Sequence, residues 1–127
     1  MNASGALIAA ADAALKTVPG LAGVHEAAPI QAAIPHVTIG AGMESDWGHK
    51  SGAGRELRLS IVLRDEGESP ARLRALADSA QAAMEGIETG GGWRLVTLVF
   101  VRSIFAAQAP GKWSAAIDYR ARMMRED

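Results

Sequence analysis

Two stretches of the chain place apolar residues at the three- and four-residue spacing of an amphipathic helix. The first extends from about residue 5, where Ser4 is suited to cap the helix, and ends before Pro19. The second has Ser69 as its cap and Pro70 as its first helical residue, and it extends to about Gly86. The expected buried stripes are Leu7, Ala11, Ala14, Leu15 and Val18 in the first helix, and Leu73, Leu76, Ala77, Ala80, Ala83, Met84 and Ile87 in the second.

Other stretches have the two-residue period of β-strands. Residues 55–65 alternate apolar and polar side chains, with four large apolar residues from Leu57 to Leu63 on one face. Residues 113–123 alternate in the same way after a turn at Pro110 and Gly111. Residues 36–39 are typical of a strand, and one further short strand is expected near Val24.

The stretch from residue 94 to 106 is also predicted to be a strand, but its pattern differs. Its centre, Leu95–Val101, is apolar at nearly every position, so both faces of the strand are apolar. Strands of this kind are usually buried on both faces. We therefore expect either a central strand or a strand with one face against another subunit.

Residues 40–54 contain five glycines and predict a long glycine-rich loop or an extended hairpin arm. Trp47 lies in the middle of this segment. A large aromatic side chain here either folds back onto its own domain or anchors an interface, because tryptophan is enriched among residues that dominate binding.

The order of these elements is helix, strand, loop, strand, helix, strand, strand. It predicts an α+β fold with an antiparallel or mixed sheet of about four strands and two helices packed on one face. A chain of 127 residues without an internal boundary favours a single domain over residues 1–127.

Composition limits the classes of function. The net charge is −1, so no overall field attracts the chain to nucleic acid or anionic lipid. There is no cysteine, which excludes disulfides and the common zinc frameworks. The first residues lack the basic start of a secretory signal, and the longest apolar run is far shorter than the ~20 residues that span a bilayer. We therefore expect a soluble protein made in the cytoplasm.

The sequence lacks the patterns of common catalytic and ligand sites. His25, His36 and His49 have no second ligand at helical spacing, and no HExxH pattern occurs. The three glycine clusters match no phosphate-binding motif, and no GxSxG pattern marks a serine nucleophile. We expect no enzyme activity, no cofactor and no metal.

Arginines recur on the polar sides of the predicted strands. One interpretation is a solvated face balanced by Asp118, Glu56 and Glu126. The other is a basic stripe that contacts a neighbouring subunit or faces DNA phosphates. The arginines concerned are Arg58, Arg64, Arg120 and Arg122, with Arg102 as a further candidate.

Several segments in a fixed order carry a family resemblance. They read IPHVTIG at residues 34–40, SDWGHK at 45–50 and GRELRLSIVLRDEG at 54–67. An Ala-rich helix at residues 71–87 and the Arg-x-Arg element of Arg120 and Arg122 follow. In this order the segments resemble the tail completion, or tail terminator, proteins of long-tailed bacteriophages and phage-like gene transfer agents. The resemblance covers nearly the whole chain.

The resemblance implies a structural virion protein without catalysis, whose copies form a ring, commonly a hexamer. Such a ring sits on the last ring of tail tube subunits, ends tube polymerisation and joins the tail to the head-side connector. DNA passes through its channel without sequence-specific binding. The expected location is the head–tail junction of the virion, after synthesis in the host bacterial cytoplasm.

Within this hypothesis, two groups of residues are candidate contacts. Subunit or tube contacts are expected at Met43, Glu44, Asp46, Trp47, His49, Lys50 and Arg55, and a subunit interface or the channel lining at Arg58, Arg64, Arg120 and Arg122. Two alternatives stay open. One is a head-side stopper or adaptor of the same particle, and the other is a small ligand-binding α+β module.

Overall fold

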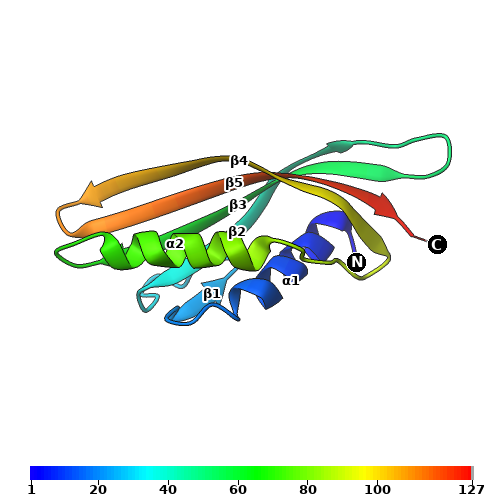
Figure 1. The fold of residues 1–127 in the computed structure, drawn as a ribbon. Coiled ribbons are helices and arrows are strands. Elements are labelled where there is room, and N and C mark those ends of the chain that lie inside the picture. Colours follow the sequence, from blue (N-terminus) through cyan, green and yellow to red (C-terminus); the bar gives the residue numbers. More distant parts are fainter. Residues whose placement is uncertain (127) are drawn as a thin grey trace.

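The computed structural model describes residues 1–126, in which two helices pack on one face of a five-stranded sheet (Figure 1). In chain order the elements are α1 (Ala3–Leu15), β1 (Gly23–His25), β2 (His36–Asp46), β3 (Gly54–Glu66), α2 (Ala71–Met84), β4 (Trp93–Ala109) and β5 (Lys112–Arg125). The α+β class and the one-sided packing of the helices are confirmed. We call the side of the sheet that carries the helices the inner face, and the other side the outer face.

The strands lie in the order β1-β2-β3-β5-β4. β1 runs parallel to β2, with Gly23 opposite His36, and the other neighbouring strands are antiparallel, so the sheet is mixed. The short strand expected near Val24 is β1, and with it the sheet has five strands rather than about four. β1 pairs only with residues 36–38, and the rest of β2 has no strand beside it on that edge among the described residues.

Helix α1 packs through the apolar stripe that the sequence predicts, but its cap differs. The Asn2 side-chain oxygen accepts a hydrogen bond of 2.7 Å from the Gly5 amide, so Asn2 caps the helix and the prediction of Ser4 is wrong. Ser4 instead lies inside the first turn, where its hydroxyl donates to the Asn2 side chain. Both residues are good caps in isolation, and the two starts differ by half a turn.

The core lies between the inner face and the two helices. Alternation in β3 places Leu57, Leu59, Ile61 and Leu63 on the inner face, each fully buried. The predicted stripe of β5 does the same with Ala115, Ile117, Tyr119, Ala121 and Met123. Leu7 and Leu15 of α1 and Leu73 and Met84 of α2 fill the space above them.

The junction between β3 and α2 is held by a buried carboxylate. Asp65, which is 3% exposed, accepts a hydrogen bond of 2.8 Å from Nε of Arg72 and another of 2.8 Å from the Glu66 amide. Helix α2 begins at Ala71, with Pro70 in the cap position and no side-chain cap, so the prediction of Ser69 as the cap and Pro70 as the first helical residue is wrong by one residue. The Ser69 hydroxyl still accepts from the Ala71 amide at 3.2 Å. The helix ends at Met84, two residues before the predicted end.

Strand β4 is an edge strand, so the prediction of a central position is wrong. β4 forms a hairpin with β5 through the turn at Pro110 and Gly111, and β5 pairs with β3 over its whole length. β5 therefore takes the position beside β3, and β4 is left outside it. Local hydrophobicity cannot reveal this order, because it depends on which strands pair over long distances in the chain.

Residues 40–54 form the far end of the β2–β3 hairpin, and we call this segment the arm. β2 continues to Asp46, β3 begins at Gly54, and Asp46 lies opposite Arg55. A side chain at Gly54 would collide with the carbonyl oxygen of Trp47, so this glycine permits the close approach of the two strands. The arm extends beyond the helix layer (Figure 1).

Candidate interaction surfaces

The exposed apolar residues of the described chain are concentrated on β4. Among residues 1–126, five of the eight exposed large apolar side chains belong to this strand. They are Val96, Val99, Phe100, Val101 and Ile104, with exposed fractions of 37–50%. The backbone edge of β4 that faces away from β5 has no neighbouring strand among these residues. A long open edge with apolar side chains is a template for pairing with another chain.

Both faces of β4 contribute to this surface. Phe100 lies opposite Tyr119 and belongs to the inner face. Val99 lies opposite Arg120, and Ile104 lies opposite Ala116, so both belong to the outer face. The apolar character on both sides, which the sequence shows, is thus only partly covered in the single chain.

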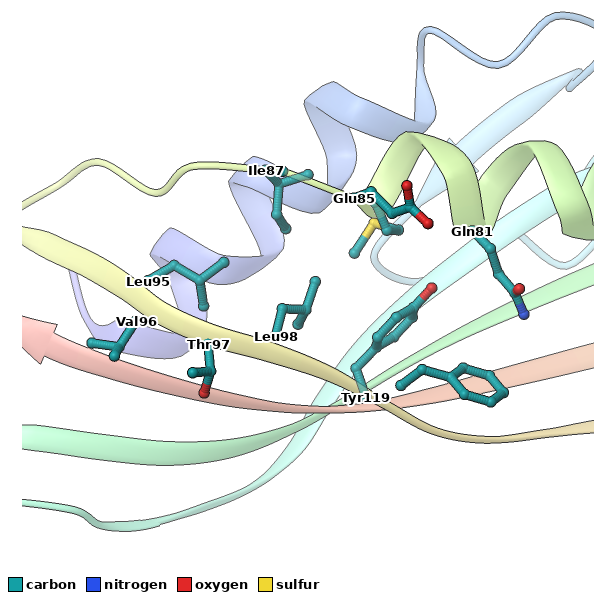
Figure 2. Close-up of a pocket in the computed structure, with 11 residues that line it drawn as sticks. Gln81, Glu85, Ile87, Leu95, Val96, Thr97, Leu98 and Tyr119 are labelled. Carbon is teal, nitrogen blue, oxygen red and sulfur yellow. The ribbon is translucent and has the colours of Figure 1, made fainter.

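A groove separates α2 from β4 on the inner face (Figure 2). It has a volume of about 420 Å³ and is lined by Met84, Ile87, Leu98 and Phe100, with Gln81 and Glu85 at its polar rim. A second hollow of about 290 Å³ continues the groove along α2, where Asp78 and Phe105 face it. The groove exists because α2 packs over β3 and β5 and does not extend over the edge strand.

Tyr119 is the polar residue inside this groove. Its side chain rises from β5 toward the end of α2, beside Glu85 (Figure 2). The residue is 5% exposed, and its hydroxyl has no hydrogen-bond partner among the described residues. Burial, with a smaller contribution from the Glu85 charge, raises the pKa of Tyr119 to about 12. The hydroxyl therefore stays protonated near neutral pH and is able to donate a hydrogen bond.

The sequence did not single out Tyr119, Glu85 or Phe100 as site residues. Alternation does place Tyr119 on the apolar side of its strand. The available signal was a hydroxyl on a stripe of otherwise apolar side chains. This signal points to a site only when β4 is known to lie at the edge, because the groove around Tyr119 depends on that position.

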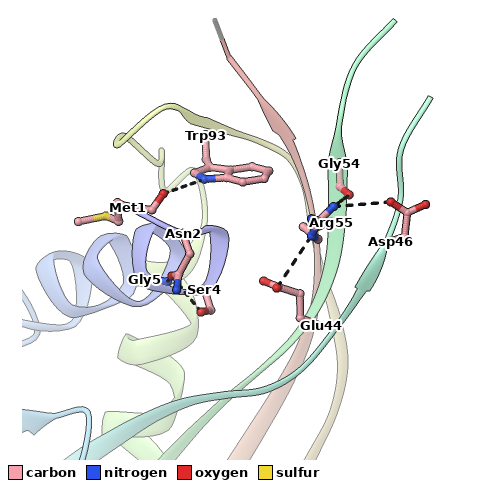
Figure 3. Close-up of polar contacts among 9 residues, drawn as sticks. All are labelled: Met1, Asn2, Ser4, Gly5, Glu44, Asp46, Gly54, Arg55 and Trp93. Atoms are coloured by element: carbon pink, nitrogen blue, oxygen red, sulfur yellow. Dashed lines mark hydrogen bonds and ion pairs between the residues drawn. The ribbon is translucent and has the colours of Figure 1, made fainter. Parts of the chain in front are cut away.

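The predicted contact residues in the arm, and Arg55 directly after it, are exposed or half-buried. Arg55 lies 3.9 Å from the Glu44 carboxylate and 3.6 Å from that of Asp46, and its guanidinium donates to the Gly54 carbonyl at 2.9 Å (Figure 3). Met43, which is 65% exposed, lies opposite Arg58 and therefore on the outer face. The same view shows Trp93, whose indole donates to the Met1 carbonyl at 3.1 Å and fixes the start of β4.

Trp47 is half-buried against its own chain. Its ring meets the ring of His49 edge-on, with centroids 4.8 Å apart, and the Arg122 guanidinium lies 5.5 Å from its centroid. Of the two expectations for this residue, folding back describes its position in the single chain. The half that stays accessible is available to another molecule.

The turn at the tip of the arm is short and well defined. The His49 amide donates to the Gly52 carbonyl at 2.8 Å, and the Gly52 amide donates to the His49 carbonyl at 3.1 Å. Lys50 and Ser51 therefore form the apex of the hairpin, and both are exposed. Lys50 has no ion pair among the described residues.

The predicted arginines gather on the outer face and are partly neutralised. Arg102 pairs with Asp118 at 2.9 Å, and Arg122 and Arg120 approach Glu56 at 3.0 and 3.8 Å. The hydrogen bond from Arg102, together with one from Ser60, holds the pKa of Asp118 below its usual value. Glu126 pairs with Arg94 instead of with this group.

Two of these arginines, Arg58 and Arg64, have no carboxylate at ion-pair distance in the described part of the chain. Five arginines thus face two carboxylates, Glu56 and Asp118. The outer face carries net positive charge although the whole chain has a net charge of −1.

The three histidines do not gather into one site. The rings of His25 and His36 are 5.8 Å apart, and His49 lies in the arm. Burial lowers the pKa of His36, whose Nδ1 lies 3.2 Å from the Ala33 carbonyl oxygen. Residues 1–126 contain no group of three side chains suited to hold a metal ion. Neither α1 nor α2 has the length and apolarity needed to cross a membrane.

Two comparisons with known proteins give a match. The family model described as "Tail completion protein gp17" matches residues 6–124. A chain of a solved structure titled "Virion of native gene transfer agent (GTA) particle" is similar in fold, with a TM-score of 0.81 and 25% sequence identity. The similarity covers 98% of this chain and 99% of that chain. Among curated proteins, no match is found.

Proposed function

The chain belongs to the tail completion protein gp17 family, and from this premise we propose that it forms a ring that ends the tail tube of a phage or gene transfer agent. The family and the structural match make it a structural, non-enzymatic component of a virion. The proposal adds that the ring lies at the head-proximal end of the tube, stops its polymerisation and joins it to the head-side connector. DNA passes through the ring.

The observation that carries the proposal is the open edge of β4. Its five exposed apolar residues lie on both faces of a strand whose outer backbone edge has no partner in the described chain. Leaving this surface in water is unfavourable, since each Å² of apolar area removed from water contributes about 25 cal/mol. Contact with a second subunit supplies the cover that the fold itself lacks.

A closed ring requires different surfaces on the two sides of each subunit, because its contacts repeat head to tail. β4 lies at one edge of the sheet, and the arm continues from β2 and β3 beyond the other elements. In the proposed ring these are the two unlike contact surfaces. Residues assigned to subunit or tube contacts are Met43, Glu44, Asp46, Trp47, His49, Lys50 and Arg55.

The outer face is proposed to border a subunit interface or the channel. Arg58 and Arg64 carry unpaired charge there, whereas Arg120 and Arg122 are partly neutralised by Glu56. Partial neutralisation suits a wall that DNA must pass, since every additional phosphate contact strengthens binding and slows passage. The proposed mechanism of termination is steric. One ring face binds the last tube ring, and the other lacks the surface on which a further tube ring would assemble.

The test is the mass of the protein by light scattering, alone and after mixing with the purified tube protein of the same particle. We expect a closed ring, or capture on tube ends with arrested tube growth seen by electron microscopy. A chain that stays a monomer or dimer and leaves tube growth unchanged contradicts the proposal. Binding to the head connector but not to tube ends would instead identify a head-side stopper or adaptor.

A further inference from the structure

Two surfaces of the chain are incomplete in complementary ways. One is the groove between α2 and β4, which contains an unpartnered hydroxyl and has acidic side chains at its rim. The other is the apex of the arm, which presents an unpaired ammonium group on a tight turn. The arm extends away from the helix layer of its own chain, so its apex is directed toward other molecules (Figure 1).

The groove has the composition of a docking site for a short polar turn. Its floor is apolar, formed by Leu98 and Phe100, and it holds the buried Tyr119 hydroxyl without a partner among residues 1–126. A buried hydroxyl without a hydrogen bond is unfavourable, because it has lost its hydrogen bonds to water and gained none in the protein. An occupant that brings a hydrogen-bond acceptor removes this cost.

The rim of the groove selects the charge of the occupant. Glu85 and Asp78 are exposed and have no ion pair among the described residues. Arg74, the basic side chain beside them, is already placed over the Phe105 ring, 4.1 Å from its centroid. With Glu85 and Asp78 against Arg74, the rim has one net negative charge and favours a cationic partner, while DNA is disfavoured by its own negative charge.

The apex of the arm provides the matching groups. Lys50 supplies the cation, and the Lys50 carbonyl and the Ser51 hydroxyl are acceptors at an exposed turn. The two cross-strand hydrogen bonds between His49 and Gly52 hold this turn in shape, so little conformational entropy is lost when it binds.

We propose that the arm apex of one copy docks in the α2–β4 groove of the next copy, with Lys50 against Glu85 and an apex oxygen accepting from the Tyr119 hydroxyl. This inference rests on the proposed ring and names the surfaces that close it. The arm and the groove are different surfaces, so the contact is head-to-tail and repeats around the ring.

The test uses introduced cysteines, which is straightforward because the chain has none of its own. The double variant Lys50→Cys/Glu85→Cys is incubated with and without tail tubes and joined by a short bismaleimide linker. We expect a ladder of cross-linked species up to the full ring. In mixtures of single variants, Lys50→Cys should be linked to Glu85→Cys, and neither should be linked to itself. A matched control is Lys112→Cys/Glu85→Cys, for which we expect no ladder.

Each outcome separates the inference from the proposed ring. Rings that form without a cross-link between positions 50 and 85 overturn the arm-in-groove contact and leave the ring in place. Links that join position 50 of two copies, or position 85 of two copies, also overturn it, since they indicate a two-fold contact. A wild-type chain that neither assembles nor arrests tubes overturns the ring and this inference together.

Charge exchange provides a second measurement that does not depend on cross-linking. Lys50→Glu and Glu85→Lys should each weaken assembly at least about tenfold, and the combined exchange should restore most of it. The control Lys112→Glu, at an exposed lysine outside the arm, should leave assembly unchanged. Two single variants that assemble as the wild type does, at equal salt, contradict the proposed pair.

Discussion

Strands β3 and β4 are both long and rich in aliphatic residues, yet they lie in opposite environments. β3, with 13 residues, alternates apolar and polar side chains and is buried on its inner face. β4, with 17 residues, is apolar on both sides and lies at the open edge. The apolar residues of β3 build the fold, whereas those of β4 exceed what a single chain is able to cover. In the proposed ring, these excess apolar residues at the edge belong to an interface rather than to a core.

Among the substitutions that test this comparison, the largest effect on stability is expected in β3. Leu59→Ala should lower the free energy of unfolding by about 2–5 kcal/mol, because Leu59 is 1% exposed and its loss leaves a cavity. Urea unfolding followed by circular dichroism measures the change. A decrease below about 1 kcal/mol would show that the inner face of β3 does not carry the core.

The sequence predicts β3 well for the same reason that this mutation is severe. Strict alternation over residues 55–65 specifies the buried face without knowledge of any partner. The same holds for β5 and for the stripes of both helices. The position of β4 could not be predicted, because an apolar run fits a central strand as well as an uncovered edge. The groove and Tyr119 depend on that position, and so they were missed as well.

The starts of both helices were predicted only to within one or two residues. Ser69 lies one residue before the observed cap position, which Pro70 occupies, and its hydroxyl contacts the Ala71 amide. Asn2 and Ser4 both suit the start of α1, and the local sequence does not decide between them; in the structure Asn2 is the cap. The arginine stripe was located by alternation, but its ion pairs depend on cross-strand register, which the sequence does not specify.

The second effect concerns the polar end of β3. The hydrogen bond from Arg72 and that from the Glu66 amide hold the pKa of Asp65 below its unfolded value. A lowered folded pKa stabilises the fold above the unfolded pKa of about 4, and this contribution is lost as the pH falls through the folded pKa. Asp65→Asn should therefore be less stable than the wild type at pH 7, by less than Leu59→Ala.

The pH dependence is checked by urea unfolding of both proteins between pH 7 and pH 2. The difference between wild type and Asp65→Asn should shrink below about pH 4, as the wild-type carboxylate takes up a proton. A difference that stays constant across this range would show that the carboxylate charge is not responsible. Asp118→Asn, at the outer-face pair with Arg102, is the matched variant on the β4 side of the sheet.

The third effect concerns β4, where we expect a small change in stability and a large change in assembly. Phe100→Asp should change the free energy of unfolding of the single chain by no more than about 1 kcal/mol, since Phe100 is 50% exposed. Assembly should be lost, because a charge then lies in the apolar contact. Light scattering with and without tubes measures assembly, and urea unfolding measures stability. Ile30→Asp, at an exposed apolar residue outside β4, is the control and should leave both unchanged.

If Phe100→Asp forms rings at the same protein concentration as the wild type, β4 is not part of the interface. A large loss of monomer stability would instead assign Phe100 to the core and weaken the contrast with β3. The two measurements together therefore decide whether the apolar residues of β4 stabilise the single chain, as those of β3 do, or the contact between subunits.

The smallest effect on the single chain is expected at the arm. Trp47 contacts His49 and Arg122 near the end of a two-stranded hairpin, away from the packed core. Trp47→Ala should therefore leave the cooperative unfolding transition almost unchanged while weakening assembly, because the arm loses an aromatic contact and the side chain that orders His49. Hydrogen exchange of the His49 and Gly52 amides reports the local loosening, and light scattering with tubes reports assembly. His49→Ala, which keeps the tryptophan, separates the two causes: if the indole itself contacts a neighbour, this variant assembles better than Trp47→Ala. Normal assembly by Trp47→Ala would remove this residue from the interface and leave Lys50 as the contact at the tip of the arm.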